Sequence, residues 1–421
     1  MALTVPNQQL SPATWRETFY RFLSGTEEAG VDWVNPICIL ALSVIGVFFI
    51  YSAHASVGGD FWVRQIVFLG TGVVLYSLCA YFNYRVLFVN AHWFYLLCLL
   101  PLPLVFFPPF GETRSGASRW LDFGVVTIQP AEIAKIGTLI MMASILARGE
   151  LSTVGKSLGV LFLTFVVTIV PFLLIFLQPD LGSALILPLM VFSLLYVSKL
   201  SLRFFLALLM VFILAVTVVG MDIYGYKNYL IRNDISAQDA RGKYEVISWF
   251  PLKDYQRERI LDFVSPDSVD PQGIGIGWNR RQSLQAVGTG GLTGKGWTEG
   301  TQAKLGYLPR SVAHNDFIFS VLSEESGFLG GLTVIGLFAV IAMNNLRIAG
   351  LSRDRFGMLV VVGAAVVLMV HVFVNIGMSL GLMPIKGLPL PFLSYGGSFI
   401  LSSFILLGLV QSVYRHRRSA T

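Results

Sequence analysis

Long apolar stretches alternate with short polar ones along most of the chain. Ten apolar runs, each bounded by charged or turn residues, cover residues 36–53, 62–81, 92–107, 130–147, 158–177, 183–198, 203–222, 317–343, 356–380 and 398–414. A helix that crosses the hydrocarbon core of a bilayer needs roughly 20 predominantly apolar residues. The pattern therefore predicts an all-α polytopic membrane protein with about ten transmembrane helices.

One segment, residues 223–316, is too polar and too long to be an ordinary connection between spans. Structureless loops of that length are uncommon, so we expect helices within it, with Pro251–Val264 as the best candidate for a helix at the membrane surface. We expect a single transmembrane domain over residues 1–421, with an N-terminal segment at 1–35 and a large loop at 223–316.

Composition supports a membrane protein. Of the 421 residues, 55% are hydrophobic and only 13% are charged, whereas soluble domains carry about 25% charged residues. The net charge of +6 comes largely from Lys and Arg in short loops, so nucleic acid is not an expected partner. The three cysteines, Cys38, Cys79 and Cys98, lie inside apolar runs, which argues against a disulfide framework or a CxxC metal site.

An even number of spans puts both termini on one side of the membrane, and the basic residues indicate which side. If the termini are cytoplasmic, the short inside segments hold thirteen Lys and Arg: Arg16, Arg21, Arg85, Arg148, Lys156, Lys199, Arg203, Arg347, Arg353, Arg355, Arg415, Arg417 and Arg418. The short outside segments hold four: Arg64, Arg114, Arg119 and Lys386. Because basic residues concentrate in cytoplasmic loops, we expect cytoplasmic termini and an extracytoplasmic loop at 223–316.

Two pairs of ionisable residues fall inside predicted spans. Glu132 and Lys135, at i and i+3, share one helix face near the outer end of their span, and Glu324 and Glu325 lie two to three turns into the eighth span. Charged groups in spans are costly and normally face a bundle interior or a cavity, which favours a functional role. The alternative for Glu132 and Lys135 is an ion pair that only neutralises itself.

The predicted outer turns contain further polar candidates. Asp180 lies in the turn Gln178-Pro-Asp-Leu-Gly-Ser183, where it is best explained alone as a turn or helix-cap residue. Asp316 ends the triplet His314-Asn-Asp316 before the eighth span, where helix capping and catalysis are equally good explanations. The Pro- and Gly-rich segment Lys386–Gly397 suggests a fixed, cavity-lining backbone, with a tight structural turn as the alternative.

Neither the glycines nor the histidines form a recognisable cofactor motif. The stretch Gly288–Gly296 fails the phosphate-loop pattern at Thr289 and Gly296, so we interpret it as a loop packed close to neighbouring backbone. The histidines at 54, 92, 371 and 416 are scattered singly, without metal-ligand spacing.

The candidate residues converge on one face. With the topology above, Arg119, Glu132, Lys135, Asp180, Asp316 and Lys386 all lie at or just below the outer face, although they come from separate parts of the chain. Transporters usually place coupling residues near the membrane midplane, so this arrangement favours chemistry on an outward-facing, lipid-linked substrate. Pro171 and Pro188, which a transporter would use to break spans, keep the transporter alternative open.

Taken together, the motifs resemble those of the SEDS (shape, elongation, division and sporulation) family of bacterial peptidoglycan polymerases. The matching stretches are Gly116-Ala-Ser-Arg-Trp120, Gln129–Lys135, Gln178–Ser183, Asp316-Phe-Ile-Phe319 with Glu324-Glu325, and Asn375–Met378 through Pro389–Gly397. Gly294-Lys-Gly-Trp297, Gly300-Thr-Gln302 and Leu308-Pro309 look more like the elongation branch, which is RodA-like, than the division branch. One departure is Leu308-Pro-Arg-Ser-Val-Ala-His-Asn-Asp316, two residues longer than the usual run, with Arg310 and Asn315 in place of Glu and Thr.

The resemblance implies a glycosyltransferase that polymerises lipid II at the outer face of the cytoplasmic membrane, beside a class B penicillin-binding protein that crosslinks the strands. Asp316 matches the family's essential outer-loop aspartate, and Trp120, Glu132, Lys135 and Asp180 match positions that line its cavity. We expect inverting transfer, with Asp316 as the base and undecaprenyl diphosphate as the leaving group. Arg119, Lys135, Lys386 or a bound divalent cation, Mg or Mn, would stabilise the charge of the diphosphate, and Glu132 would orient Lys135 or help to hold that cation.

Two rival functions remain at the level of sequence. A lipid II flippase would need a continuous polar path, for which the inner half of the spans offers little ionisable material. A non-catalytic scaffold for the penicillin-binding protein would not need Glu132 and Lys135 inside the membrane.

Overall fold

The structure of the protein is a computed structural model. It describes residues 30–55, 58–107, 111–114, 117–122, 127–149, 154–198, 200, 202–237, 239–266, 270, 275 and 277–418. Residues 1–29, which form most of the predicted N-terminal segment and include Arg16 and Arg21, lie outside the described residues. So does Lys199, another of the predicted inside residues.

Each predicted span corresponds to a helix or to a pair of short helices. They are α2 (Val34–His54), α3 (Phe61–Tyr81), α5 (Ala91–Leu99) with α6 (Pro101–Leu104), α7 (Pro130–Arg148), α8 (Val154–Leu177), α9 (Leu181–Val197), α10 (Leu202–Asn233), α16 (Ile318–Leu351), α17 (Arg355–Ser379) and α18 (Gly397–Arg415). Within the described chain, eight helices are long and apolar enough to cross a membrane, and α5–α6 and α9 are shorter apolar segments. The expectation of an all-α polytopic membrane protein is confirmed.

Two spans differ from the predicted pattern in informative ways. The third span is interrupted between α5 and α6 because Pro101 has no backbone N–H to continue the ladder of hydrogen bonds. The seventh, α10, continues eleven residues beyond the predicted end at residue 222, because Ile223, Tyr226 and Leu230 of this extension are buried in a cluster with residues of the long loop. With 32 residues it is about 48 Å long. Its C-terminal end therefore projects beyond the apolar part of the span.

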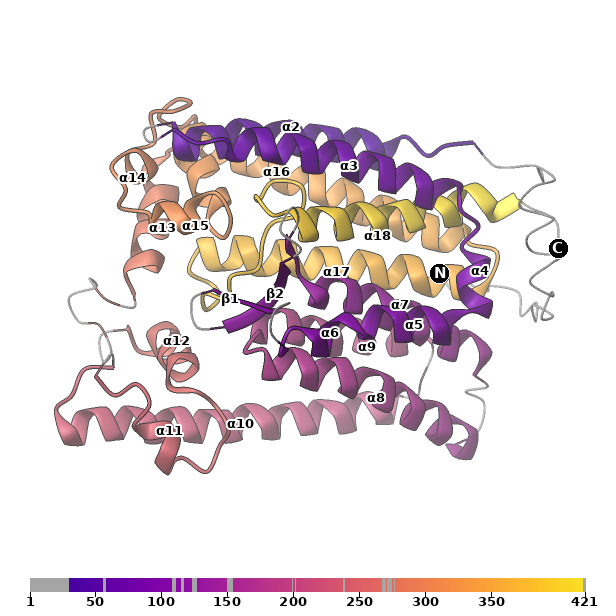
Figure 1. Ribbon diagram of the computed structural model, residues 1–421, viewed down its shortest axis with the longest axis horizontal. Coiled ribbons are helices and arrows are strands. Elements are labelled where there is room, and N and C mark those ends of the chain that lie inside the picture. The colour runs from indigo at the N-terminus through magenta and orange to yellow at the C-terminus, as the bar shows by residue number, and fades with distance from the viewer. Residues whose placement is uncertain are drawn as a thin grey trace.

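The buried centre of the bundle is formed mainly by α7, α17 and α18. Glycines let these helices approach their neighbours: a Cβ at Gly363 of α17 would lie 2.0 Å from Leu139 of α7, and one at Gly408 of α18 would lie 2.7 Å from Cys79 of α3. By contrast, α10 lies at the edge of the bundle (Figure 1): near its start the ring of Phe205 lies 5.2 Å from that of Phe192 on α9, and its most apolar stretch contains no buried residue.

The short helices of the long loop gather at one end of the bundle, opposite the beginning of α2 and the end of α18 (Figure 1). They are α11 (Tyr244–Ile247), α12 (Asp254–Val264), α13 (Trp278–Thr289), α14 (Thr301–Lys304) and α15 (Arg310–Ala313). The described residues also form α4 (Arg85–Val89) and the 3₁₀ turn η2 (His416–Arg418). The predicted helix at 251–264 corresponds to α12. Its polar side chains Gln256, Arg257, Glu258 and Asp262 are buried, so much of α12 packs against the rest of the protein.

A small antiparallel sheet connects α6 to α7. Its strands are β1 (Gly111–Arg114), β2 (Ala117–Asp122) and β3 (Thr127–Ile128), in the order β1-β2-β3. Gly111 pairs with Leu121, which in turn pairs with Ile128 across the sheet. Leu121 is buried, so the central strand is fixed against the bundle and presents its neighbours Arg119 and Trp120 at the loop end.

Helix α16 is broken at Gly327, where φ is 67° and ψ is −164°. The Gly-rich loop after α13 repairs the break: the N–H groups of Lys295 and Gly296 donate to the carbonyls of Glu324 and Glu325, each at 3.0 Å. In the other direction, the N–H groups of Phe328 and Leu329 donate to loop carbonyls at 2.9 and 3.1 Å. The predicted close packing of this loop against neighbouring backbone is therefore confirmed, and the freed groups of the broken helix are satisfied inside the protein.

Candidate active site

Asp316 lies in the turn that leads into α16, and its side chain does not cap that helix. The N-cap residue is Phe317, without a side-chain capping bond. The Asn375 amide of α17 fixes the local backbone by donating to the carbonyl of Asp316 at 3.0 Å and to that of Leu388 at 2.7 Å. The Asp316 carboxylate faces Gly387, where a Cβ would lie 3.2 Å from Oδ2. In the described part of the chain this carboxylate accepts no hydrogen bond, so it is available to a substrate.

The electrostatic surroundings tune Asp316. Burial raises the pKa of Asp316 to about 6; the nearby guanidinium groups of Arg259 and Arg119 oppose the rise, and the carboxylate of Asp180 adds to it. A carboxylate with this pKa is ionised near neutral pH yet basic enough to accept a proton.

Arg119 and Asp180 are held by well-defined polar contacts. Arg119, on β2, donates from Nε to the carbonyl of Gln178 at 3.2 Å and from Nη2 to that of Pro179 at 2.5 Å. Asp180 caps α9: its carboxylate accepts from the backbone N–H and hydroxyl of Ser183 at 3.2 and 2.9 Å. The capping role expected for Asp180 is confirmed, and the same turn brings Asp180 and Arg119 close enough to Asp316 to affect its pKa.

Lys386 belongs to the loop that also carries Gly387. Its backbone carbonyl packs on the first turn of α9, because a Cβ at Gly182 would lie 3.2 Å from it. The side chain is partly buried, and burial together with the charge of Arg259 lowers the pKa of Lys386 to about 8. Within the described residues the Lys386 ammonium forms no ion pair, which leaves it available to an anionic ligand.

Glu132 and Lys135 lie inside the bundle. Lys135 donates to Glu132 at 2.8 Å, and the two side chains are 2% and 5% exposed. Glu132 also accepts from Ser402 at 3.0 Å, and Lys135 lies 3.0 Å from Nε2 of His371. The other imidazole nitrogen is 3.3 Å from the carbonyl of Pro389. The pair is thus linked through His371 to the loop that carries Lys386.

A second link joins this buried pair to the outer turn. Gln129, the N-cap residue of α7, donates from its amide to Asp180 at 3.0 Å, and its backbone N–H donates to Ser398 of α18 at 3.0 Å. Glu132 lies about one turn after Gln129, in the first turn of α7. The structure therefore brings Asp316, Arg119, Asp180 and Lys386 together, with Glu132 and Lys135 in the layer beneath them.

Trp120 follows Arg119 on β2 and is partly buried. Because successive strand residues point to opposite faces, its indole and the Arg119 guanidinium diverge. Glu324 and Glu325 have internal partners: Glu324 accepts from Lys295 at 2.6 Å, and Glu325 accepts from the hydroxyl of Ser52 at 2.5 Å. Glu324 and Glu325 therefore hold parts of the fold together.

Two residues of the site were missed from the sequence. Arg259 of α12 is exposed and near enough to Asp316 to lower the pKa of that carboxyl. The available signal in the sequence was its spacing of four residues from Tyr255, which puts both residues on one helix face. In the structure the Arg259 guanidinium lies 5.9 Å from the centre of the Tyr255 ring. His371 gave no signal because it is an isolated histidine in an apolar span.

The site has the character of an anion site. Arg259 and Arg119 act on the Asp316 carboxylate, and Arg259 also lies near Lys386. The second carboxylate, Asp180, caps α9. Among the residues that the structure describes, no three His, Cys, Asp or Glu side chains come close enough to hold a metal ion. The protein's own groups here fit a diphosphate better than a resident metal.

Fold and site together define a multi-pass membrane protein with a cation-rich polar site where the long loop meets the bundle. The sequence pattern of the FtsW, RodA and SpoVE family, described as a cell cycle protein, matches residues 32–419. The chain belongs to this family of multi-pass bacterial membrane proteins, which confirms the resemblance drawn from the motifs.

Relatives and solved structures agree with this assignment. The chain is 35% identical over 392 residues to the peptidoglycan glycosyltransferase MrdB of Escherichia coli, covering 93% of this chain and 95% of the relative. It is 32% identical to the peptidoglycan glycosyltransferase RodA of Treponema pallidum, covering 91% and 97%.

Among solved structures, a peptidoglycan synthase complex that coordinates polymerization and crosslinking contains a chain with a TM-score of 0.70 and 29% identity, covering 93% and 99%. The rod shape determining protein RodA of Thermus thermophilus gives a TM-score of 0.63 at 26% identity, with the same coverage.

Proposed function

We propose that this protein is a peptidoglycan glycosyltransferase of cell elongation, which polymerises lipid II at the outer face of the cytoplasmic membrane. The observation that carries the proposal is the Asp316 carboxylate, which has no hydrogen-bond partner among the described residues, has a pKa of about 6 and lies near the guanidinium groups of Arg259 and Arg119. A base and an anion site side by side are what transfer from a sugar diphosphate requires.

In the proposed reaction, Asp316 accepts the proton of the acceptor sugar's 4-hydroxyl as that oxygen attacks the anomeric carbon of the donor. The bond between the anomeric carbon and the diphosphate oxygen breaks as the new glycosidic bond forms, so configuration inverts without a covalent intermediate. Undecaprenyl diphosphate leaves with the electron pair. Arg119, Arg259 and Lys386 would stabilise its charge, and a divalent cation bound with the substrate would neutralise part of the same charge.

The residues beneath the site would keep it in place. Lys135 and Glu132 neutralise each other inside the membrane, and His371 connects them to the carbonyl of Pro389. We assign this layer the task of fixing the loop that carries Lys386, and we assign Trp120 to the wall of the substrate cavity.

Orientation and partner follow from the same proposal. The bias of basic residues supports cytoplasmic termini, with the segment 223–316 outside and the whole of 1–421 as one transmembrane domain. The similarity to a chain of a peptidoglycan synthase complex supports a penicillin-binding protein as partner, and we propose that it is of class B.

The test is incubation of the purified protein with lipid II, with and without a class B penicillin-binding protein and with Mg²⁺, Mn²⁺ or chelator. Glycan length is read on a gel. Asp316→Asn and Asp316→Ala should lose polymerisation while remaining folded in the membrane, whereas Asp234→Asn, in the same long loop but outside the site, should retain it. Near-normal polymerisation by the Asp316 variants would refute the assignment of the base. Translocation of lipid II in liposomes without polymer would replace the enzyme by a flippase.

A further inference from the structure

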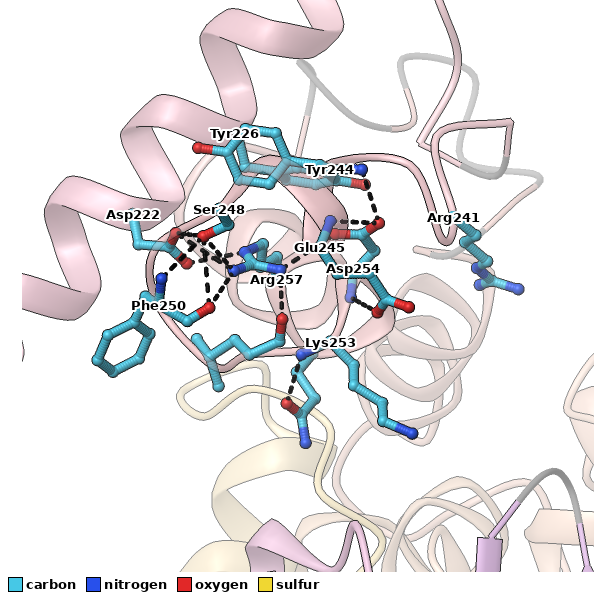
Figure 2. Close-up of polar contacts among 12 residues, drawn as sticks. Asp222, Tyr226, Arg241, Tyr244, Glu245, Ser248, Phe250, Lys253, Asp254 and Arg257 are labelled. Atoms are coloured by element: carbon cyan, nitrogen blue, oxygen red, sulfur yellow. Dashed lines mark hydrogen bonds and ion pairs between the residues drawn. The ribbon is translucent and has the colours of Figure 1, made fainter. Parts of the chain in front are cut away.

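Arg257 of α12 is a fully buried cation whose donors are all engaged. Nε donates to Asp222 of α10 at 2.7 Å, and Nη2 reaches the same carboxylate at 3.3 Å. Nη2 also donates to the hydroxyl of Ser248 and the carbonyl of Phe250, each at 2.8 Å. Nη1 donates to Asp254 at 3.1 Å and to the carbonyl of Leu252. Figure 2 shows Arg257 at the centre of this network, with Asp222 approaching from the adjacent helix.

The same short helix presents different residues to the active site. Tyr255 and Arg259, four residues apart, share one face of α12. The Tyr255 hydroxyl donates to the carbonyl of Pro179 at 3.3 Å, and the Arg119 guanidinium donates to that carbonyl too. One side of α12 is thus clamped to α10, while another contacts the turn before Asp180.

We propose that Arg257 is a positioning residue for the glycosyl transfer: by clamping α12 to Asp222, it sets the place of Arg259 beside Asp316. The inference rests on the proposed function. A residue without contact to the reacting groups would thereby fix the position of one of the charges that act on them. The position of Arg259 would then depend on α10, a span at the edge of the bundle.

The chemistry of the clamp favours this role. Both partners are fully buried, so the pair is costly to desolvate and adds little stability compared with an apolar contact of the same volume. It does supply geometry, because the planar guanidinium fixes direction at several acceptors at once. A lysine has neither the planar fork nor enough donors for these acceptors. Arg257→Lys therefore keeps the charge and loses the geometry.

The acid limb of the polymerisation rate against pH is the decisive measurement, because it reports the ionisation of Asp316. The charged groups that act on Asp316 are Arg259, Arg119 and Asp180. If Arg259 moves away, the Asp316 carboxylate loses a stabilising charge and the acid limb moves to higher pH. Arg259→Gln removes the same charge directly.

We expect Arg257→Lys, Asp222→Asn and Arg259→Gln to move the acid limb upward by similar amounts. Combining Arg257→Lys with Arg259→Gln should move it no further than Arg259→Gln alone. Arg241→Gln is the matched control: it removes the charge of a guanidinium that pairs with Glu258 of α12 but leaves the Arg257–Asp222 contact intact, so the limb should stay.

The outcomes separate the two proposals. An unchanged limb in folded Arg257→Lys and Asp222→Asn, with only thermal stability lowered, would make the clamp purely structural and overturn the inference. Full additivity in the double variant would overturn it as well. If Arg257→Lys does not fold, Asp222→Asn alone decides. A wild type that makes no polymer under any condition would refute the proposed function instead.

Discussion

The carboxylate of Asp316 lies against the backbone of Gly387, a residue with φ of +66°. A side chain at that position would crowd Oδ2 from 3.2 Å and would also require a left-handed conformation. The loop after α17 thus leaves room beside the proposed base only because this residue has no Cβ.

Gly387→Ala is therefore expected to lower polymerisation about 10²-fold, the scale of loss that a misplacement near 1 Å can cause. Left-handed strain of about 1–2 kcal/mol should add a modest loss of stability. Gly291→Ala separates the two effects, since Gly291 has φ of +58° and open space at its Cβ. Equal activity in the two variants would mean that strain alone, and no crowding of Asp316, limits the enzyme.

A bell-shaped dependence of the polymerisation rate on pH follows from the two perturbed groups. Asp316 works as a carboxylate, so activity falls as the pH drops through its pKa of about 6. Lys386 works as a cation, so activity falls as the pH rises through its pKa of about 8. Lys386→Arg should remove the alkaline limb and keep the acid one, because arginine stays charged above this range. An alkaline limb that survives in Lys386→Arg would assign it to another group.

Asn375 should matter for activity beyond its effect on stability. Its buried amide joins the backbone of Asp316 to that of Leu388, so Asn375→Ala should cost about 1–3 kcal/mol of unfolding free energy. Asn345→Ala removes one hydrogen bond of 2.8 Å, from Asn35, near the opposite end of the bundle. Thermal unfolding should fall in both, whereas the polymerisation rate per folded molecule should fall only in Asn375→Ala. A parallel loss of rate in both variants would contradict a local role.

Removing one partner of the buried pair of Glu132 and Lys135 should destabilise the protein more than removing both. Glu132→Gln should destabilise the protein by about 3–5 kcal/mol, because it leaves the Lys135 ammonium uncompensated inside the membrane. Adding Lys135→Met should restore much of that loss in thermal unfolding. If the pair also fixes the Lys386 loop through His371, the stable double variant should still polymerise slowly; wild-type rates would reduce the pair to a structural one.

The lengths of the apolar runs were sufficient to predict the spans but not to predict how the spans pack against one another. All ten apolar runs are helical because run length and composition alone decide which segments suit the bilayer. The break at Pro101 follows from the missing N–H of proline. The extension of α10 to Asn233 was not predicted, because polar residues interrupt the apolar run after Met221 and hydropathy cannot distinguish a helix in water from a loop.

Of the candidate site, residues next to recognisable motifs were found and residues brought in by tertiary packing were not. Asp316, Asp180 and Lys386 flank the ends of spans, where a topology already places them at one face. Arg259 reaches the site through the packing of α12, and the Arg257–Asp222 contact that holds this helix spans 35 residues of sequence. His371 sits inside an apolar run, and nothing in its local sequence indicates that Lys135 is its neighbour.

The break in α16 provides the last prediction. Gly294 has φ of +84°, and a Cβ there would lie 2.1 Å from the carbonyl oxygen of Glu325. Gly294→Ala must therefore push the loop away from the break and weaken the bonds that satisfy Glu324 and Glu325, beyond about 1–2 kcal/mol of backbone strain. Gly288→Ala, with open space at its Cβ on helix α13, should be neutral or stabilising.

Thermal unfolding and proteolysis of the long loop should distinguish these two variants. Because the break lies only about three turns after Asp316, in the helix that this residue precedes, Gly294→Ala should also slow polymerisation, as the first turns of α16 lose their fixed direction. Equal stability and equal cleavage of Gly294→Ala and Gly288→Ala would show that the loop does not hold the broken helix. If Gly294→Ala is as stable as the wild type but polymerises slowly, the direction of α16 affects activity independently of the stability of the fold.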